Sequence, residues 1–235
     1  MSVLLETQGL GKRFSGLVAN ADIDFRLERG EIRSVIGPNG AGKTTFISMI
    51  SGHLAPSSGR IAYKGRDITR LPVVSRARLG IGRKFQTPSL FDNLTAYANV
   101  ELATLRARAP RGRIGEVLAL VRLEPEARTP ARHLSHGQRQ WLEIALLLAN
   151  GAELVLLDEP TAGMTAEETH ATGQLIRDLA RSLHLSTIVI EHDINFVRDL
   201  AAPVTVLHLG RVLTEGPFEA VAEDPRVRDV YLGTG

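Results

Sequence analysis

A glycine-rich loop between a predicted strand and a predicted helix constrains the fold of this chain more than any other feature. Residues 37–44 fit the pattern G-x-x-x-x-G-K-[ST], after an apolar stretch at 32–36 and before a helical pattern at 43–50. Glycines let backbone N–H groups turn around phosphate oxygens, and a helix start favours an anion. The loop therefore predicts a nucleoside-triphosphate site. The residues expected to hold the nucleotide are Gly37, Pro38, Asn39, Gly40, Ala41, Gly42, Lys43, Thr44 and Thr45.

Strands and helices alternate along most of the chain. In the first section Ala21, Ile23, Phe25 and Leu27 alternate with Asn20, Asp22, Asp24 and Arg26, which predicts a half-buried strand. Further strands are predicted at 60–64, 154–157 and 187–190, helices at 166–183 and from 195, and a hairpin at 204–213. Strands alternating with helices imply a parallel sheet covered on both faces. Because the pattern from 87 to 150 is helical, we expect an α/β core interrupted by a helical lobe.

Two acids after a buried strand supply a second part of the predicted site. The apolar run 154–157 ends at Asp158 and Glu159, and open α/β sheets bind ligands at the C-terminal ends of their strands. Asp158 suits coordination of Mg²⁺, directly or from its second shell. Glu159 points elsewhere and can polarise the attacking water as a general base. Without the phosphate loop, a surface Asp-Glu pair would be the default interpretation.

The segment Leu134-Ser135-His136-Gly137-Gln138 distinguishes among nucleotide-binding families. It resembles the signature L-S-G-G-Q of the ABC (ATP-binding cassette) family, and a predicted helix follows it at 139–149. A serine hydroxyl, a glycine backbone and amides at a helix start form a second anion site, and Ser135 is also expected to cap this helix. Together with the two preceding motifs, the resemblance to ABC ATPases covers essentially the whole chain.

The resemblance implies the fold and its subdivision. Members of the family are α/β proteins with a P-loop (RecA-like) nucleotide-binding core, an antiparallel β subdomain and an inserted α-helical subdomain. Carried over, residues 1–235 form one ABC ATPase domain. Its catalytic core comprises 1–86 and 151–235, and 87–150 form the helical subdomain that carries the signature.

The same resemblance implies a site shared between two subunits. Because two ATPase subunits of this family close head to tail, Ser135, Gly137 and Gln138 are expected at the γ-phosphate bound by the other subunit. Gln86 matches the Q-loop glutamine that senses Mg²⁺ and water, and His192 matches the switch histidine that contacts the γ-phosphate. These implications add Gln86 and His192 to Glu159 as predicted catalytic residues.

ATP and Mg²⁺ are the cofactors that the resemblance implies. Lys43 is expected to reach the β- and γ-phosphates. The expected metal ligands are Thr44, Gln86 and Asp158. Phe14, 29 residues before Lys43, matches the aromatic residue that stacks on adenine. The competing interpretation of Phe14 is ordinary packing, since stacking and packing use the same apolar ring face.

Two positions depart from the family pattern. His136 replaces the first glycine of the signature, so the backbone there is less free. Thr165 stands where the D-loop usually ends in Asp, although Thr is also a good N-cap for the helix that follows. Neither position belongs to the predicted catalytic set, and we do not interpret them as inactivating.

Longer stretches narrow the resemblance to one group of importers. The runs 79–88, 134–143, 162–165 and 224–233 look like the ATPases of branched-chain amino-acid and urea importers, and His136 and the Gly-Met-Thr loop look closer to the urea branch. Such importers combine membrane-spanning permease subunits, a second ATPase subunit and a solute-binding protein that acts indirectly. The resemblance therefore implies a peripheral protein on the cytoplasmic face of the inner membrane that energises urea import, with branched-chain amino-acid import as the alternative.

Two alternatives come from other functional classes. One is a soluble ABC ATPase of DNA repair, chromosome structure or translation. Those DNA-acting proteins need long heptad-bearing insertions and the translation factors usually carry two cassettes, whereas this chain has one cassette and a compact lobe. The other is a module that binds ATP without hydrolysing it, and the complete set of predicted catalytic residues argues against it.

Composition limits these readings further. The chain has no cysteine, which excludes disulfides and thiolate metal sites, and no apolar run approaches the ~20 residues of a membrane helix. A net charge of +2 gives nucleic-acid binding no general electrostatic support, and no nucleic-acid partner is expected. Between residues 60 and 86, eight Lys or Arg stand against one acid. We interpret that stretch as a solvated face, with a surface for acidic lipid or an acidic partner as the alternative.

Overall fold

The strands form two sheets within residues 2–84, 90–107 and 112–232, the part of the chain that the computed structural model describes. The antiparallel sheet has the order β2-β1-β4-β5, comprising β2 (Leu17–Glu28), β1 (Val3–Phe14), β4 (Ser58–Tyr63) and β5 (Arg66–Asp67). The other sheet has the order β10-β9-β3-β8-β7-β6, comprising β10 (Arg211–Gly216), β9 (Val204–His208), β3 (Ile32–Ile36), β8 (Ser186–Ile190), β7 (Leu154–Asp158) and β6 (Ile81–Lys84). The fold is therefore the predicted α/β core with an antiparallel β subdomain.

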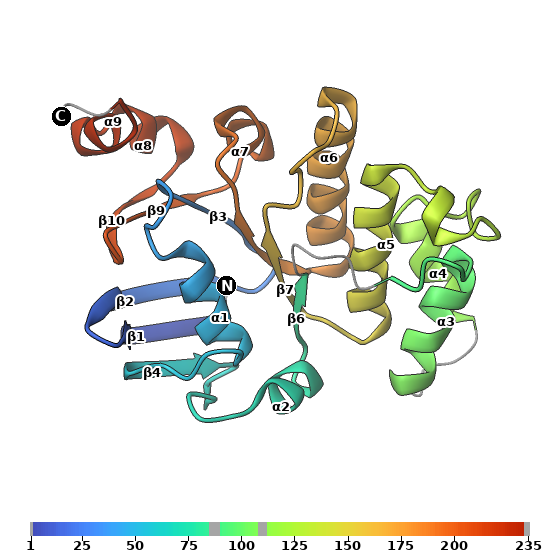
Figure 1. The fold of residues 1–235 in the computed structure, drawn as a ribbon, viewed down its shortest axis with the longest axis horizontal. Coiled ribbons are helices and arrows are strands. Elements are labelled where there is room, and N and C mark those ends of the chain that lie inside the picture. Colours follow the sequence, from blue (N-terminus) through green and yellow to red (C-terminus); the bar gives the residue numbers. More distant parts are fainter. Residues whose placement is uncertain (1, 85–89, 108–111, 233–235) are drawn as a thin grey trace.

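Helices surround the six-stranded sheet and extend to one side of it (Figure 1). They are α1 (Lys43–Ser51), α2 (Val73–Arg78), α3 (Ala96–Ala107), α4 (Arg113–Leu120), α5 (His136–Ala149), α6 (Ala166–Leu183), α7 (Ile194–Leu200), α8 (Phe218–Glu223) and α9 (Pro225–Leu232), with a 3₁₀ turn at Ala131–His133. Helices α3, α4 and α5 gather at one end of the molecule, next to α6. No helix of the described residues is both long and apolar enough to cross a bilayer.

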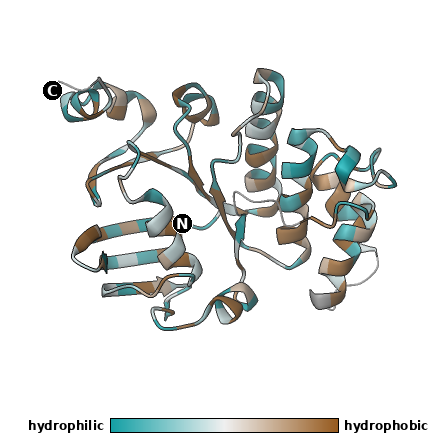
Figure 2. Cartoon of the chain, in the orientation of Figure 1, coloured by the Kyte–Doolittle hydropathy of each residue, from teal (hydrophilic) through white to brown (hydrophobic). Residues whose placement is uncertain are grey.

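Strands β6, β7, β8, β3 and β9 run parallel, and β10 joins the edge antiparallel to β9. All five residues of β7 are buried, and its four apolar side chains pack alternately into two hydrophobic cores. Leu154 and Leu156 pack with α1 and the antiparallel sheet, whereas Val155 and Leu157 pack with α5 and α6. This alternation is expected for a strand buried on both faces, and Figure 2 colours the central strands of the sheet as hydrophobic. The C-terminal ends of the parallel strands meet at one edge.

Strand β2 follows the predicted alternation over most of its length. Ile23, Phe25 and Leu27 are buried and Asp24 is exposed. Asn20, which we placed on the exposed face, is instead fully buried. Its Nδ2 donates a hydrogen bond of 3.2 Å to the carbonyl oxygen of Gly42. The alternation fails at this end because the polar side chain has a partner in the phosphate loop.

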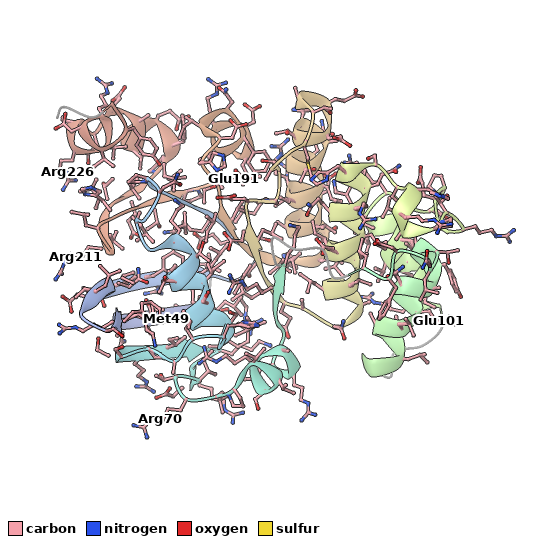
Figure 3. All side chains as sticks on the ribbon, in the orientation of Figure 1. Met49, Arg70, Glu101, Glu191, Arg211 and Arg226 are labelled. Carbon is pink, nitrogen blue, oxygen red and sulfur yellow. The ribbon has the colours of Figure 1, made fainter. Side chains whose placement is uncertain are left out.

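Three cations of the basic stretch at 60–86 are not on a solvated face. Arg76 is 1% exposed, and its guanidinium donates to the carbonyl oxygens of Met49 and Ile50 at the end of α1. Arg83 and Lys84, on β6, are buried beside acids. For these three residues both interpretations of the stretch were wrong, because each is held inside by a specific acceptor. The other five cations are exposed, and Arg70 projects from the edge of the molecule (Figure 3).

Candidate functional site

The phosphate loop connects β3 to α1, and its backbone requires glycine at two positions. Gly37 has φ +151°, and a Cβ there would lie 2.1 Å from the carbonyl oxygen of Leu207. Gly42 has φ +97°, and its Cβ would lie 2.5 Å from the carbonyl oxygen of Ala19. Any other residue would therefore move the loop away from β9 or from β2. The glycines fix the loop against its neighbours as well as permitting its turn.

Helix α1 begins without a side-chain cap. The first N–H groups of a helix lack acceptors within the helix, so this start is a place where an anion can bind. Lys43 lies here with its Nζ donating to the carbonyl oxygens of Gly37, at 2.7 Å, and Pro38, at 3.0 Å. Burial lowers the pKa of Lys43 from its ordinary value, while Glu159 and Asp158 act to raise it. The ammonium therefore lies between the loop and the two acids.

Asp158 ends β7 and is 2% exposed. Its Oδ2 lies 3.3 Å from Nη2 of Arg83, and its Oδ1 is buried with no hydrogen-bond partner among the described residues. Burial raises the pKa of Asp158, while Arg83 and the nearby Thr44 hydroxyl lower it. A buried carboxylate oxygen without a donor, close to a hydroxyl, suits a Mg²⁺ that takes its other ligands from phosphates and water.

Glu159 and His192 follow the neighbouring strands β7 and β8. The amide of Glu159 donates to the carbonyl oxygen of Ile190 at 2.9 Å, and Glu159 has φ +50°, in the left-handed region. Nδ1 of His192 lies 3.7 Å from Oε1 of Glu159, and both side chains reach solvent. The structure thus brings the predicted general base and the predicted switch histidine together at the edge where the parallel strands end.

Glu191, to which no sequence motif assigned a role, holds the segment of His192 in place. Glu191 is 1% exposed and accepts hydrogen bonds from the Thr161 hydroxyl at 2.6 Å and the Thr161 amide at 3.1 Å. Its other oxygen accepts from the amide of His192 at 3.2 Å. It ties the loop of His192 to the loop that follows Glu159, inside the molecule (Figure 3). The position of Glu191 directly after an apolar strand is the sequence feature that could have indicated its role.

The three signature residues lie together at the start of α5. Ser135 caps the helix by accepting from the Gln138 amide, and Gln138 Oε1 accepts from the Ser135 amide, which completes a capping box. The helix therefore begins one turn earlier than the predicted 139. Figure 1 separates this end of α5 from α1, so within one chain the signature and the phosphate loop form two separate groups.

Two further predicted residues have less structural context. Phe14 ends β1 with 40% of its surface exposed, and Nζ of Lys12 lies 5.1 Å from its ring centroid. An exposed ring is available for stacking, and its role in adenine binding stays a prediction. Gln86 lies outside the described residues. Its predicted roles in catalysis and metal binding therefore stay predictions.

Comparisons with known proteins agree with this geometry. A model of the ABC transporter family matches residues 21–162, and one of branched-chain amino acid ATP-binding cassette transporters matches 211–235. LptB of Acidithiobacillus ferridurans, a lipopolysaccharide export system ATP-binding protein, is 37% identical over 99% of this chain and 98% of its own length. BraF of Pseudomonas aeruginosa, a high-affinity branched-chain amino acid transport ATP-binding protein, is 33% identical over 98% of both chains.

Solved structures show the same fold. The ADP conformation of MJ1267, an ATP-binding cassette of an ABC transporter, superposes with a TM-score of 0.89 at 25% identity, covering 99% of this chain and 100% of the other. The dimeric structure of MJ0796, a bacterial ABC transporter cassette, gives a TM-score of 0.79 at 26% identity, covering 92% and 99%. This chain belongs to the ABC transporter family, as one of its ATP-binding, ATP-hydrolysing subunits.

Proposed function

We propose that this ATPase energises a membrane importer for branched-chain amino acids. The observation that carries the proposal is the match of residues 211–235 to the branched-chain amino acid transporter model, at the opposite end of the chain from the phosphate loop. BraF and the LivG protein of Archaeoglobus fulgidus, each 33% identical over almost the whole chain, support it. The C-terminal segment and these two relatives therefore favour the same substrate class.

Urea, our first expectation from the sequence, has weaker support. It rested on His136 and on the loop 162–165, and the relatives described above point to branched-chain amino acids or to lipopolysaccharide instead. Export is a second candidate because LptB is 37% identical. The match at 211–235 favours import over export. Since the solute does not touch an ATPase subunit of this kind, no side chain described above can read it directly.

The chemistry we propose is positioning and charge stabilisation of the transferred phosphoryl group. The amides at the start of α1 and the ammonium of Lys43 would hold the phosphates. Thr44 and Asp158 would hold Mg²⁺, which when bound neutralises developing charge on the phosphate oxygens. Glu159 takes a proton from the attacking water, and His192, 3.7 Å away, steadies the same water and the γ-phosphate.

We propose further that two such subunits close around ATP, as the dimeric cassette structure supports. Ser135, Gly137 and Gln138 of one subunit would meet the γ-phosphate held by the other, which accounts for their separation from the phosphate loop within one chain. Segment 87–150 would move as the helical subdomain and transmit closure to the permease subunits. The protein would then be peripheral on the cytoplasmic face of the inner membrane.

A groove between α2 and the end of α5 is the site we propose for contact with the permease. It has a volume of about 430 Å³, and its lining combines apolar side chains such as Val73, Val74 and Leu147 with polar ones such as Arg78 and Asn150. It also includes Gly82 and Arg83 of β6, the strand that leads to Gln86. A permease segment seated here would touch both the core and the helical region.

The test is reconstitution with the membrane subunits encoded beside this ATPase. ATP turnover would be measured in proteoliposomes with a solute-binding protein supplied with leucine, with urea or with neither, and in proteoliposomes that contain lipopolysaccharide. We expect stimulation by leucine. Stimulation by urea alone would keep the mechanism and overturn the substrate class, and turnover that responds only to lipopolysaccharide would replace import with export.

A further inference from the structure

The carboxylate of Glu168, in the first turn of α6, occupies the start of α5. The Ser135 hydroxyl donates to its Oε1 at 2.8 Å, and the Gly137 amide donates to the same oxygen at 3.1 Å. Its Oε2 accepts from the amide of Thr165 at 3.1 Å, as part of the capping box of α6. One carboxylate therefore bridges two helix starts, with one oxygen at each.

The fit of this carboxylate depends on glycine at position 137. A Cβ on Gly137 would lie 3.0 Å from Oε1 of Glu168 and 3.1 Å from its Cγ, closer than ordinary contact, and would push the side chain away. Hydrogen bonds from Ser135, Thr165 and Gly137 lower the pKa of Glu168. The group is therefore an anion at neutral pH, and it already uses the donors of the signature.

A second contact joins the same two segments. Nε2 of His136 lies 2.9 Å from the carbonyl oxygen of Ala162. A carbonyl oxygen only accepts, so the contact is a hydrogen bond in the tautomer that carries the proton on this nitrogen. Of the two departures from the family pattern, His136 therefore contacts the segment 162–168 directly, whereas Thr165 contacts Glu168, which in turn contacts the start of α5.

We propose that Glu168 is a positioning residue that holds the signature donors in place of a phosphate and must leave them when the subunits close. The proposal rests on the proposed function, in which the γ-phosphate bound by the other subunit reaches Ser135 and Gly137. The Ser135 hydroxyl and the Gly137 amide each have one proton to donate, so they cannot fully serve the Glu168 carboxylate and a γ-phosphate together. A carboxylate and a phosphate held at the same two donors would also repel each other. Glu168 therefore raises the ATP concentration that closure requires, without affecting ATP binding by a single chain.

The test measures ATP-dependent association of the full chain in a Glu159→Gln background, in which closed dimers are expected to persist. Light scattering would give the ATP concentration for half-maximal association, alone and with the ATPase subunit encoded beside it. Adding Glu168→Gln keeps the shape and removes the charge, and we expect the required ATP concentration to fall by about fivefold. Glu168→Ala, which removes the carboxylate altogether, is expected to lower it as well.

Glu167→Gln is the matched control, because it removes the same charge one residue earlier. Among the described residues the structure shows no hydrogen bond from the signature to Glu167, so the ATP requirement should stay at the parent value. Affinity for a fluorescent ATP analogue, measured below the association concentration, should be equal in all variants.

The outcomes separate this inference from the proposed function. If the parent associates with ATP but neither Glu168 variant lowers the requirement, the inference is overturned while the two-subunit site survives. An equal shift in Glu167→Gln also overturns it, since a general charge effect would then be the cause. A parent that binds ATP yet never associates, even with the neighbouring ATPase subunit, overturns the two-subunit site and the inference together.

Discussion

Helices α1 and α5 both begin with backbone amides that lack acceptors within the helix, but the two starts differ in whether the chain supplies those acceptors. Helix α1 begins after Gly42 with no side-chain cap, so its first amides are left for a ligand. Helix α5 begins at a complete capping box and also donates to Glu168, so its donors are already used by the chain itself. Among the described residues, the start of α1 has no side-chain partner within the chain. The start of α5 can only exchange a partner that it already has.

The difference extends to where each helix gains its stability. The uncapped α1 is stabilised at its far end, where Gly52 forms a left-handed C-cap and Arg76 donates to the last carbonyl oxygens. Buried side chains such as Phe46 and Ile47 anchor its middle. In α5 the cap at Ser135 contributes about 1 kcal/mol at the functional end itself. The stabilising contacts of α1 thus lie away from its N-terminus, where the phosphate is expected to bind. Those of α5 lie at its N-terminus, which carries the signature residues.

The largest expected effect tests whether the open site carries the chemistry. Glu159→Gln removes the proposed base while keeping its size, and we expect ATP turnover to fall about 10²- to 10⁴-fold. Phosphate release would give the rate, and equilibrium binding of ATP should be unchanged. Turnover at the parental rate would show that another group activates the water.

A second pair of variants tests the comparison directly. Lys43→Ala removes the ammonium from the phosphate loop, and we expect the affinity of a single chain for ATP to fall by about 100-fold, as for a lost charged contact. Ser135→Ala at the other helix start should leave that affinity unchanged but reduce turnover. Calorimetric titration at low protein concentration gives the affinities. A comparable loss in both variants would mean that the signature already serves the chain's own nucleotide.

Much of the open site was predictable from the sequence because its determinants are local. The phosphate loop needs glycines at fixed spacing, and an apolar strand delivers Asp158 to the sheet edge whatever lies around it. The helix at Ala166–Leu183 and the cap at Thr165 were correct for the same reason. Short-range rules fix these features, so spacing along the chain suffices.

The contacts that complete the molecule were not predictable, because they join segments distant in sequence. Asn20 seemed exposed by alternation but is buried against Gly42, and Arg76 seemed solvated but caps α1 from inside. No sequence motif links Glu168 to the signature, since only the fold brings α6 beside α5. Each is a polar residue whose burial or charge is compensated by specific hydrogen-bond partners, which periodicity cannot reveal.

Glycine substitutions test how much the close packing of the phosphate loop contributes to the stability of the fold. Gly37→Ala places a Cβ 2.1 Å from a backbone oxygen of β9, and we expect the free energy of unfolding to fall by about 3 kcal/mol. Gly40→Ala is the matched control, since no atom lies within 4 Å of its Cβ. At φ +79° it should cost about 1 kcal/mol from backbone strain alone. Denaturant unfolding measures both, and equal losses would remove close packing as the reason for Gly37.

The smallest expected effect concerns the closed site. His136→Gly restores the glycine usual in the family, loses the contact with Ala162 and adds backbone freedom at the first residue of α5. We expect the free energy of unfolding to fall by about 1 kcal/mol.

His136→Ala separates the two causes, because it loses the ring without adding that freedom. If His136→Ala unfolds like the parent, the contact with Ala162 contributes nothing and the glycine alone accounts for the loss. A loss in His136→Gly larger than that of Gly37→Ala would reverse the comparison. The start of α5 would then carry more of the fold's stability than the phosphate loop, and its donors could not be released for a nucleotide without local unfolding.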